Sequence, residues 1–320
     1  MIDHLIKTPL KELQSEAFRI RKAHFGDKLT FSIPNTVSYH HENFPSRQDR
    51  FSAISVTGTN CDLQCGHCRG KLLESMIPAE DPETFLRVIN RLHTCGAFGI
   101  LVSGGANRHG EVPLKKFIPA IKTIKERDPQ FKVILHTGLI RREIAEELKE
   151  AKVDQILIDI MGDDDTIREV YHLNKCTRDY EETLRMLKEM GHHLAPHIII
   201  GHHFGEIKGE WKALEMITQI GVETIVLVIF KPLFPIEKGQ MKIPSPEETS
   251  RISAIARILN PTLPIRMGCI RPAHPWKAEM EKGFINSGAN TIAYPLQGTI
   301  DYAEEIGLQT KLIEMCCSLL

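Results

Sequence analysis

The sequence lacks several features that would assign it to a particular class of protein. No apolar run reaches the roughly 18 residues of a membrane-spanning helix, and residues 1–7 lack the apolar stretch of a secretory signal. No long run of one charge occurs, and 40 Lys and Arg residues nearly balance 41 Asp and Glu residues. Neither nucleic acid nor a membrane is therefore an expected partner, and we expect a soluble, cytoplasmic protein.

The sequence also lacks the paired cysteine spacing of most structural zinc sites. Its eight cysteines are irregularly spaced over 320 residues, which fits a reducing compartment where thiols bind metals rather than form disulfides. A structural zinc site usually draws on two C-x-x-C-type pairs that lie far apart. Only one such pair occurs here, so zinc is an alternative rather than the main interpretation.

Three cysteines stand close together in the segment Cys61-Asp62-Leu63-Gln64-Cys65-Gly66-His67-Cys68, here called the cysteine loop. The spacing C-x3-C-x2-C supplies three thiolates, one fewer than a 4Fe-4S cluster normally takes from protein. An open metal position can bind a small molecule, as it does in catalytic zinc sites. Cys61, Cys65 and Cys68 are therefore predicted to be catalytic metal ligands; unrelated buried thiols are the other alternative.

This spacing resembles the signature of the radical S-adenosylmethionine superfamily. The resemblance implies that S-adenosylmethionine chelates the open iron through its amino and carboxylate groups. One electron, ultimately from a ferredoxin- or flavodoxin-type donor, would then cleave the sulfonium to a 5'-deoxyadenosyl radical. The protein would position this cofactor and exclude water. His67 occupies a position where the family often has an aromatic residue, and we expect it to pack beside the cofactor.

Short apolar runs alternate with amphipathic helical segments, which is typical of βα units around a parallel sheet. The predicted strands are 52–58, 99–103, 132–136, 155–160, 197–201, 224–230, 264–268 and 290–293. Apolar residues at helical spacing occupy 82–93, 141–151, 179–190, 211–220 and 246–259. Eight repeats predict an α/β fold, a (β/α)8 TIM-type barrel that is closed or incompletely closed. Its site should lie at the C-terminal ends of the strands, where the cysteine loop falls.

Three regions are predicted along the chain. Residues 1–50 do not match the repeat and suggest an N-terminal helical cap across the barrel, with one helix over 10–24. Residues 51–298 would form the barrel and residues 299–320 a C-terminal helical extension. Tyr39-His40-His41 offers a possible metal pair, although adjacent loop histidines are usually solvated.

Two strand ends carry further candidate residues. Strand 99–103 runs into Ser103-Gly104-Gly105, where paired glycines let backbone approach a ligand closely. The family has a GGE-like segment here that binds the methionine amino group; this chain lacks its acidic residue. Asp159 is predicted to point inward at the end of the fourth strand, where a carboxylate is costly unless it has a task. Asp163-Asp164-Asp165 reads as a helix cap.

The next two loops offer three more candidates for cofactor binding. Arg178 precedes a predicted helix and could pair with the S-adenosylmethionine carboxylate in bidentate fashion. The fifth strand ends in a segment from Gly201 to Glu206 that resembles the family's segment contacting ribose and adenine. His202 and His203 also suggest a zinc site together with His197, but neighbours in an extended segment point in opposite directions.

Most of the chain after residue 10 resembles the biotin synthase group of the superfamily. The resemblance rests on the cysteine loop, Gly104-Gly105, Thr177-Arg178-Asp179-Tyr180, the strand ending at Glu206, Ile265-Arg266-Met267 and Gly288-Ala289-Asn290-Thr291-Ile292. Biotin synthase holds a sacrificial 2Fe-2S cluster with three further cysteines and an arginine. Those cysteine positions are roughly Val102, Ile134 and His197 here, and only Arg266 keeps its type. Biotin formation is therefore disfavoured.

The chain resembles one subunit of the archaeal-type two-component lipoyl synthase more closely. The segments that carry this resemblance are residues 57–76, residues 158–163 and Gly268-Cys269-Ile270-Arg271-Pro272. The N-terminal C-x4-C-x5-C motif of single-chain lipoyl synthases is absent. The resemblance implies sulfur insertion into C-H bonds of an octanoyl chain on a carrier protein, with a second such subunit as a partner. Other biotin synthase-like enzymes, similar to methylornithine synthase or the hydrogenase-maturation enzyme, are the alternative, and a non-catalytic iron-sulfur or zinc protein is a distant one.

Sulfur insertion would require a second cluster as the sulfur source. Cys269 follows the seventh predicted strand and Cys176 the fourth, so both should face the barrel mouth. Cys316-Cys317 could fold over that mouth, although a buried helix end is the alternative. These four cysteines are the predicted ligands of a possible auxiliary cluster. Cys95 precedes the second strand, at the opposite face, and is expected only to pack.

Overall fold

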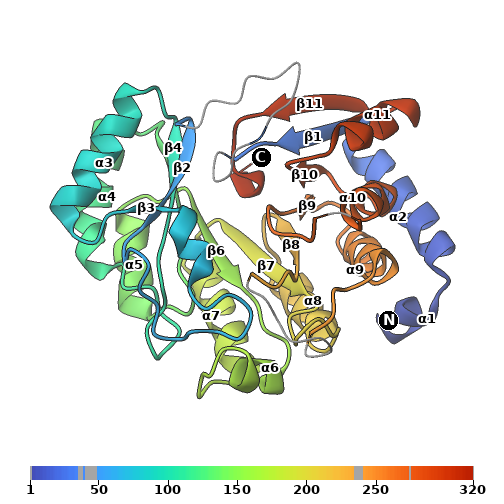
Figure 1. Cartoon of the computed structure of the whole chain (residues 1–320), viewed down its shortest axis with the longest axis horizontal. Coiled ribbons are helices and arrows are strands. Elements are labelled where there is room, and N and C mark those ends of the chain that lie inside the picture. Colours follow the sequence, from blue (N-terminus) through green and yellow to red (C-terminus); the bar gives the residue numbers. More distant parts are fainter. Residues whose placement is uncertain (1, 35–38, 40–48, 234–240, 274, 320) are drawn as a thin grey trace.

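Runs of Val and Ile become strands of one parallel sheet that curls into a barrel (Figure 1). The computed structural model describes residues 2–34, 39, 49–233, 241–273 and 275–319. The strands, in sheet order, are β11 (Gln309–Ile313), β1 (Lys28–Ser32), β10 (Thr291–Ala293), β9 (Ile265–Met267), β8 (Ile225–Ile229), β7 (Leu194–Ile200), β6 (Gln155–Asp159), β5 (Lys132–His136), β4 (Gly99–Ser103), β2 (Phe51–Ser55) and β3 (Ile77–Pro78). All five residues of β8 are buried, as expected for a parallel strand covered on both faces.

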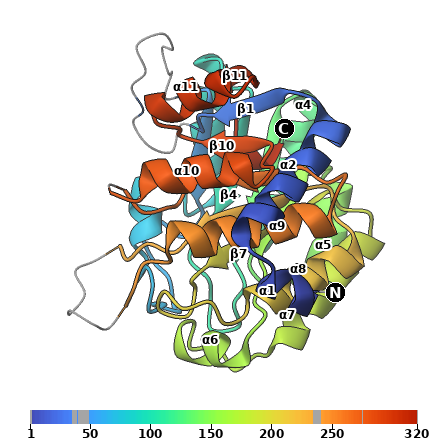
Figure 2. The ribbon, with the colours of Figure 1, turned by 90° about the vertical axis from the view of Figure 1, so that its right-hand side faces the viewer.

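Helices cover the outside of this sheet, and α2, α9 and α10 lie side by side there (Figure 2). The α-helices are α1 (Ile2–Lys7), α2 (Leu10–Phe25), α3 (Pro82–Thr94), α4 (Ile118–Arg127), α5 (Arg142–Glu150), α6 (Asp164–Glu169), α7 (Thr177–Glu189), α8 (Glu210–Ile220), α9 (Pro246–Leu259), α10 (Lys277–Asn286) and α11 (Gln297–Glu305). Short 3-10 helices are η1 (Lys71–Ser75), η2 (Lys115–Phe117) and η3 (Cys317–Leu319). No helix of the described residues is long and apolar enough to cross a membrane.

Alternating side chains give the sheet two different faces. Ile156 and Ile158 of β6 belong to the large outer core under the helices, whereas Leu157 belongs to a smaller inner cluster. The inner cluster comprises Ile33, Phe51, Ile134, Leu157, Ala195, Val226, Val228, Ala293, Tyr294, Cys316 and Cys317. It fills part of the space that the strands enclose, here called the lumen.

The barrel is incompletely closed, which confirms the predicted fold class. The hydrogen-bonded order runs from β11 to β3, and no strand pair of the described residues joins these two ends. Across the gap, Arg50 Nε lies 3.7 Å from Glu314 Oε2, so an ion pair links the start of β2 to the end of β11. Eight of the strands coincide closely with the predicted ones.

The first residues take a place that differs from the expected cap. Residues 28–32 form β1, which pairs in parallel with both β10 and β11, and α2 packs on α9. This part of the predicted 1–50 cap therefore belongs to the barrel wall. The predicted C-terminal helical extension contains the end of α11, then β11 and η3. His40 and His41 of the possible metal pair lie outside the described residues.

Candidate active site

The cysteine loop follows β2 at the C-terminal end of the strands. Cys65 and Cys68 are buried and Cys61 is partly buried. The Asp62 N–H donates to the Ala106 carbonyl oxygen at 3.0 Å, and the Gly66 N–H donates to the Val170 carbonyl oxygen at 2.8 Å. The loops after β4 and β6 therefore hold the cysteine loop in place.

The thiols of this loop interact with one another. A hydrogen bond between Cys65 and Cys68 lowers the pKa of Cys68 and raises the pKa of Cys65, with burial adding to the rise. The neighbouring His67 imidazole also favours the Cys68 thiolate. Thiolate is the form that ligates iron, so the loop provides ligand-competent sulfur.

His67, Tyr171 and His202 form an aromatic group beside these thiols. The His67 ring centroid lies 5.4 Å from that of Tyr171 and 4.9 Å from that of His202. Burial lowers the pKa of His202 and favours its neutral form, and its Nε2 lies 3.0 Å from the Tyr171 hydroxyl, within hydrogen-bond distance. Among the described residues, His67 Nδ1 is buried without a hydrogen-bond partner. Such an orphaned atom requires an explanation, and a bound ligand is one.

The glycine pair after β4 packs against the cysteine loop itself. A Cβ added at Gly105 would lie 1.9 Å from the Asn60 carbonyl oxygen and 2.6 Å from Cys61 Cα. The Gly105 N–H donates to Thr57 Oγ1 at 2.7 Å, while Ser103 Oγ donates to the His136 carbonyl oxygen at 3.0 Å. At Gly105 the close approach is therefore between two protein segments, and it fixes the position of Cys61. The cofactor roles of Ser103, Gly104 and Gly105 remain predictions.

Gly105→Ala is expected to push the cysteine loop away from β4. The clash with backbone cannot be relieved by a side-chain rotation, so the free energy of unfolding should fall by roughly 1–3 kcal/mol, and the iron content should fall with it. Gly298→Ala in α11 is the matched control, because a Cβ there meets no atom within 4 Å, and it should gain roughly 0.4–1 kcal/mol. Denaturant unfolding and iron analysis measure both. Equal stability of the two variants would contradict this account.

Asp159, His136 and His197 form a polar bridge inside the lumen: His136 and Asp159 end β5 and β6, and His197 lies in the middle of β7, paired with Asp159. His136 Nε2 lies 3.4 Å from Asp159 Oδ1, and the His136 and His197 rings stack with centroids 5.3 Å apart. Burial opposes ionisation of Asp159, but the adjacent His136 outweighs it and holds the pKa of Asp159 below its ordinary value. Asp159 in turn raises the pKa of His136 despite its burial.

His197 is the neutral member of this bridge. Burial, with the neighbouring His136, lowers its pKa to about 4. Its Nδ1 lies 2.9 Å from the Ala195 carbonyl oxygen, so that nitrogen carries the proton and Nε2 is left as an acceptor. The bridge combines an ion pair with a neutral acceptor. The sequence pointed to Asp159 as a functional residue and to His197 only as a member of an alternative zinc site, and it gave no signal for His136.

The loop after β7 depends on Glu210 rather than on Glu206. Glu206 is exposed, whereas Glu210 is buried and accepts hydrogen bonds from the N–H groups of Gly201 at 2.6 Å and Lys208 at 2.8 Å. Gly201 has φ +79°, and a Cβ there would lie 2.1 Å from Pro244. Neither predicted residue contacts the cysteines in the described structure; their cofactor roles remain predictions.

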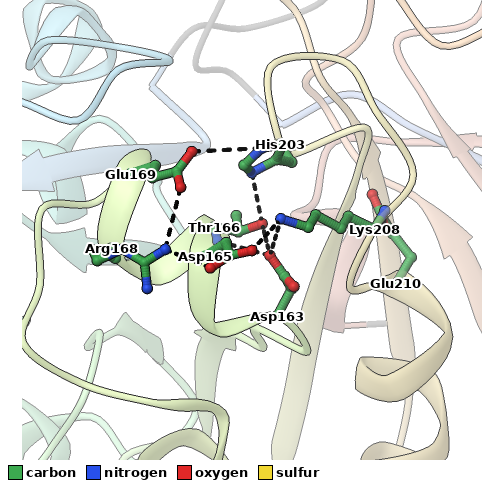
Figure 3. A network of polar contacts seen from close by, with 8 residues as sticks. All are labelled: Asp163, Asp165, Thr166, Arg168, Glu169, His203, Lys208 and Glu210. Atoms are coloured by element: carbon green, nitrogen blue, oxygen red, sulfur yellow. Dashed lines mark hydrogen bonds and ion pairs between the residues drawn. The ribbon is translucent and has the colours of Figure 1, made fainter.

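A polar network ties α6 to this same loop (Figure 3). Asp163 caps α6 by accepting from the Thr166 N–H at 2.8 Å, and Lys208 Nζ lies 2.6 Å from Asp165 Oδ2. His203 Nδ1 lies 3.1 Å from Thr166 Oγ1. His203 is thus turned toward α6 while His202 faces Tyr171, so these two histidines do not share a ligand.

Arg178 lies on the outer surface of α7. Its side chain is 81% exposed, and its Nε donates to Glu182 Oε1 at 2.6 Å within the same helix. This hydrogen bond raises the pKa of Arg178. The structure does not bring Arg178 to the cysteine loop, and its proposed contact with a cofactor carboxylate remains a prediction.

Three other cysteines gather in the lumen: Cys269 from the loop after β9, and Cys316 and Cys317 from the C-terminal segment. We call them the lumen thiols. Hydrogen bonding to Cys269, together with burial, raises the pKa of Cys317, and hydrogen bonding to Cys317 raises that of Cys316. Gln155 Nε2 of β6 donates to the Ser318 carbonyl oxygen at 3.0 Å and so anchors this segment inside the barrel.

Arg266 of β9 is the cation that faces the lumen thiols. It is buried, its Nε donates to Thr224 Oγ1 at 2.7 Å, and burial lowers its pKa to about 10 against the attraction of Cys317 and Cys316. The Arg266 charge opposes the rise in the pKa of Cys317 but does not outweigh hydrogen bonding and burial. Sequence reasoning noted the arginine but could not place it next to the C-terminal cysteines.

The other predicted cysteines are elsewhere. Cys176 caps α7, and its N–H donates to Asp179 Oδ2 at 2.8 Å. Cys95 is exposed at the C-terminus of α3. The interactions of the lumen thiols join Cys269, Cys316 and Cys317, three of the four cysteines predicted as auxiliary ligands. The auxiliary cluster itself remains a prediction.

The donor sets fit iron-sulfur clusters better than single ions. No group of three or more His, Cys, Asp or Glu in the described residues is arranged to hold one metal ion. A 4Fe-4S cluster instead places each thiolate on a different iron, so its ligands need not converge on one point. The cysteine loop, with its orphaned His67 nitrogen, fits such a cluster with a ligand beside it.

Comparisons with known proteins agree with this geometry. The chain is similar to biotin synthase of Staphylococcus haemolyticus, at 24% identity over 80% of this chain and 74% of the relative. It is also 25% identical to biotin synthase of Staphylococcus aureus, over 80% of this chain and 71% of that relative. Among solved structures, methylornithine synthase superposes with a TM-score of 0.62 at 13% identity, covering 97% of this chain and 93% of that one.

Another solved structure is the FeFe-hydrogenase maturase HydG from Carboxydothermus hydrogenoformans, with a TM-score of 0.65 at 13% identity over 96% of this chain and 74% of that one. At such identities the structural matches establish the fold alone. The model of the Radical SAM superfamily matches residues 55–217, just over half of the chain, and includes the cysteine loop. The chain therefore belongs to the radical S-adenosylmethionine superfamily.

Proposed function

We propose that this enzyme inserts sulfur into C-H bonds of an octanoyl chain held on a carrier protein, in lipoyl cofactor biosynthesis. The observation that carries the proposal is the gathering of Cys269, Cys316 and Cys317 inside the lumen. A radical enzyme that only rearranges its substrate has no need of a second set of thiols inside the barrel. The similarity to biotin synthases, whose second cluster is a sulfur source, supports the same interpretation.

The polar bridge is coupled electrostatically to a neighbour of the cysteine loop and to one of the lumen thiols. Asp159 acts electrostatically on Tyr171, which packs with the cysteine loop, and His136 interacts with Cys316. A substrate entering the lumen would therefore lie with one set on each side. The apolar inner cluster would accommodate a hydrocarbon chain and exclude water from it.

Members of the superfamily bind a 4Fe-4S cluster and S-adenosylmethionine, and they require an electron donor. When bound here, the first centre would supply a radical that removes one hydrogen atom, and the second would supply the sulfide that replaces it. One electron would enter for each S-adenosylmethionine cleaved, and one would remain on the iron of the second centre for each C-S bond formed. Cys61, Cys65 and Cys68 would hold the first centre. The lumen thiols would hold the second, with the Arg266 charge beside them.

An anaerobic assay tests this function. Reconstituted protein, reductant and S-adenosylmethionine are incubated with an octanoylated lipoyl-domain peptide, with and without a second radical S-adenosylmethionine subunit. Mass spectrometry should detect thiolated peptide, and the same peptide carrying an acetyl group should remain unchanged. Formation of 5'-deoxyadenosine without thiolation in either arm, together with about four irons per chain rather than about eight, would contradict the proposal. That result would favour chemistry of the methylornithine synthase or hydrogenase-maturase type.

A further inference from the structure

Arg271 and Glu281 form an ion pair that is fully enclosed near the lumen thiols. Their side chains are 2% and 0% exposed, and Arg271 Nη2 lies 2.6 Å from Glu281 Oε1. Burying two charges costs more than burying apolar residues of the same size, so such a pair is weak evidence for a contribution to stability. Its position suggests another role.

The Arg271 guanidinium joins the C-terminal ends of two adjacent strands. Its Nη1 donates to the Gly268 carbonyl oxygen at 3.1 Å, immediately after β9, and its Nη2 donates to the Tyr294 carbonyl oxygen at 2.7 Å, immediately after β10. It also donates to the Ala293 carbonyl oxygen. Five donors in a rigid fork allow one side chain to make all these bonds, and a lysine cannot replace it.

Glu281 of α10 completes this arrangement from the other side. Its Oε2 accepts from the Leu296 N–H at 2.9 Å and from the Thr299 hydroxyl at 2.5 Å, which fixes the start of α11. Cys269 lies between Gly268 and Arg271, on the turn that the guanidinium holds. Tyr294 belongs to the inner cluster with Cys316 and Cys317.

We infer that Arg271 and Glu281 are positioning residues for the second cluster, and this inference rests on the proposed function. By fixing the turn that bears Cys269 against the end of β10, the pair sets the separation between Cys269 and the two C-terminal thiols. Backbone hydrogen bonds also hold this turn, but they join it to β8 and not to β10. The Gly268 N–H donates to the Leu227 carbonyl oxygen at 2.8 Å, and the Ile229 N–H donates to the Ile270 carbonyl oxygen at 2.9 Å.

The chain offers a matched control in Arg257, which joins the opposite ends of the same strands. Arg257 is fully buried and donates to the Leu263 carbonyl oxygen at 2.7 Å, before β9. It also donates to the Gly288 carbonyl oxygen at 3.1 Å and to the Asn290 side chain, before β10. Arg257→Lys should therefore disturb the packing of β9 and β10 as much as Arg271→Lys, but far from the lumen thiols.

The experiment compares iron and labile sulfide, electron paramagnetic resonance spectra, thermal unfolding and 5'-deoxyadenosine formation in the two variants. Arg271→Lys should fall from about eight irons per chain to about four, lose the second cluster's signal, and still form 5'-deoxyadenosine. Arg257→Lys should keep about eight irons at a similar loss of thermal stability. Glu281→Gln, which removes the charge at constant size, should show the same selective loss as Arg271→Lys.

Two results would overturn the inference alone. One is that Arg271→Lys and Glu281→Gln keep both clusters in a protein whose wild type holds about eight irons. The other is that both variants fail to fold while Arg257→Lys folds, which would make the pair part of the fold only. About four irons in the wild-type protein would instead overturn the proposed function, and the inference with it.

Discussion

Cys65→Ala is expected to reduce 5'-deoxyadenosine formation by at least about 100-fold, because replacing even an outer partner of a metal ligand costs roughly 10–100-fold. Cys65 is buried and hydrogen-bonded to Cys68, so no neighbouring sulfur can move into its place without unfolding the loop. The measurement is chromatographic quantification of 5'-deoxyadenosine after anaerobic reconstitution, with reductant and S-adenosylmethionine but no substrate. Iron content should fall by about four per chain.

Cys95→Ala provides the control for this variant. Cys95 is exposed at the end of α3, so its removal should leave iron content and 5'-deoxyadenosine formation at the wild-type values. Radical formation that persists in Cys65→Ala would show that the cysteine loop does not hold the reactive centre.

Cys317→Ala is expected to abolish thiolation of the substrate while radical formation continues. Cys317 hydrogen-bonds to both other lumen thiols, so its loss removes the central member of that group. 5'-Deoxyadenosine formation should stay within about twofold of wild type, because the cysteine loop belongs to a separate cluster of buried residues and distant sites behave independently. Iron analysis should show a loss of about four irons, and mass spectrometry should show unmodified octanoyl peptide.

Cys176→Ala tests whether Cys176, the fourth cysteine that the sequence predicts as an auxiliary ligand, holds the second cluster together with the lumen thiols. Cys176 caps α7, and its replacement should reduce stability slightly without changing the iron content. If Cys176→Ala lost the second cluster, or if Cys317→Ala still produced thiolated peptide, the assignment of that centre to the lumen thiols would be wrong.

The sequence predicted the barrel well because its strands are local signals. Runs such as Ile225–Ile229 are buried on both faces and contain only Ile, Val and Leu, and turn residues bound them. Strands β4 and β5 have the predicted bounds. β1 and β11 were missed because Lys28–Ser32 and Gln309–Ile313 are partly polar, and the two strands pair with each other although they come from opposite ends of the chain.

The site was predicted less completely because burial depends on tertiary packing. A local pattern favoured Glu206, yet only Glu210 is buried and accepts the backbone hydrogen bonds of the loop. Arg178 has the right residue type but faces solvent on α7. The association of Cys269 with Cys316 and Cys317 joins distant parts of the chain, and no spacing rule expresses it.

The pairing of β1 with β11 sets an order of events during synthesis. Cys61 and Cys316 are 255 positions apart (316 minus 61), which at about 5–20 residues per second is roughly 10–50 s of translation. Through most of that interval the cysteine loop has already been synthesised, whereas β11, which pairs with β1, and two of the three lumen thiols, Cys316 and Cys317, have not. The first centre can therefore be loaded on a growing chain, but the second can form only after the wall of the barrel is complete.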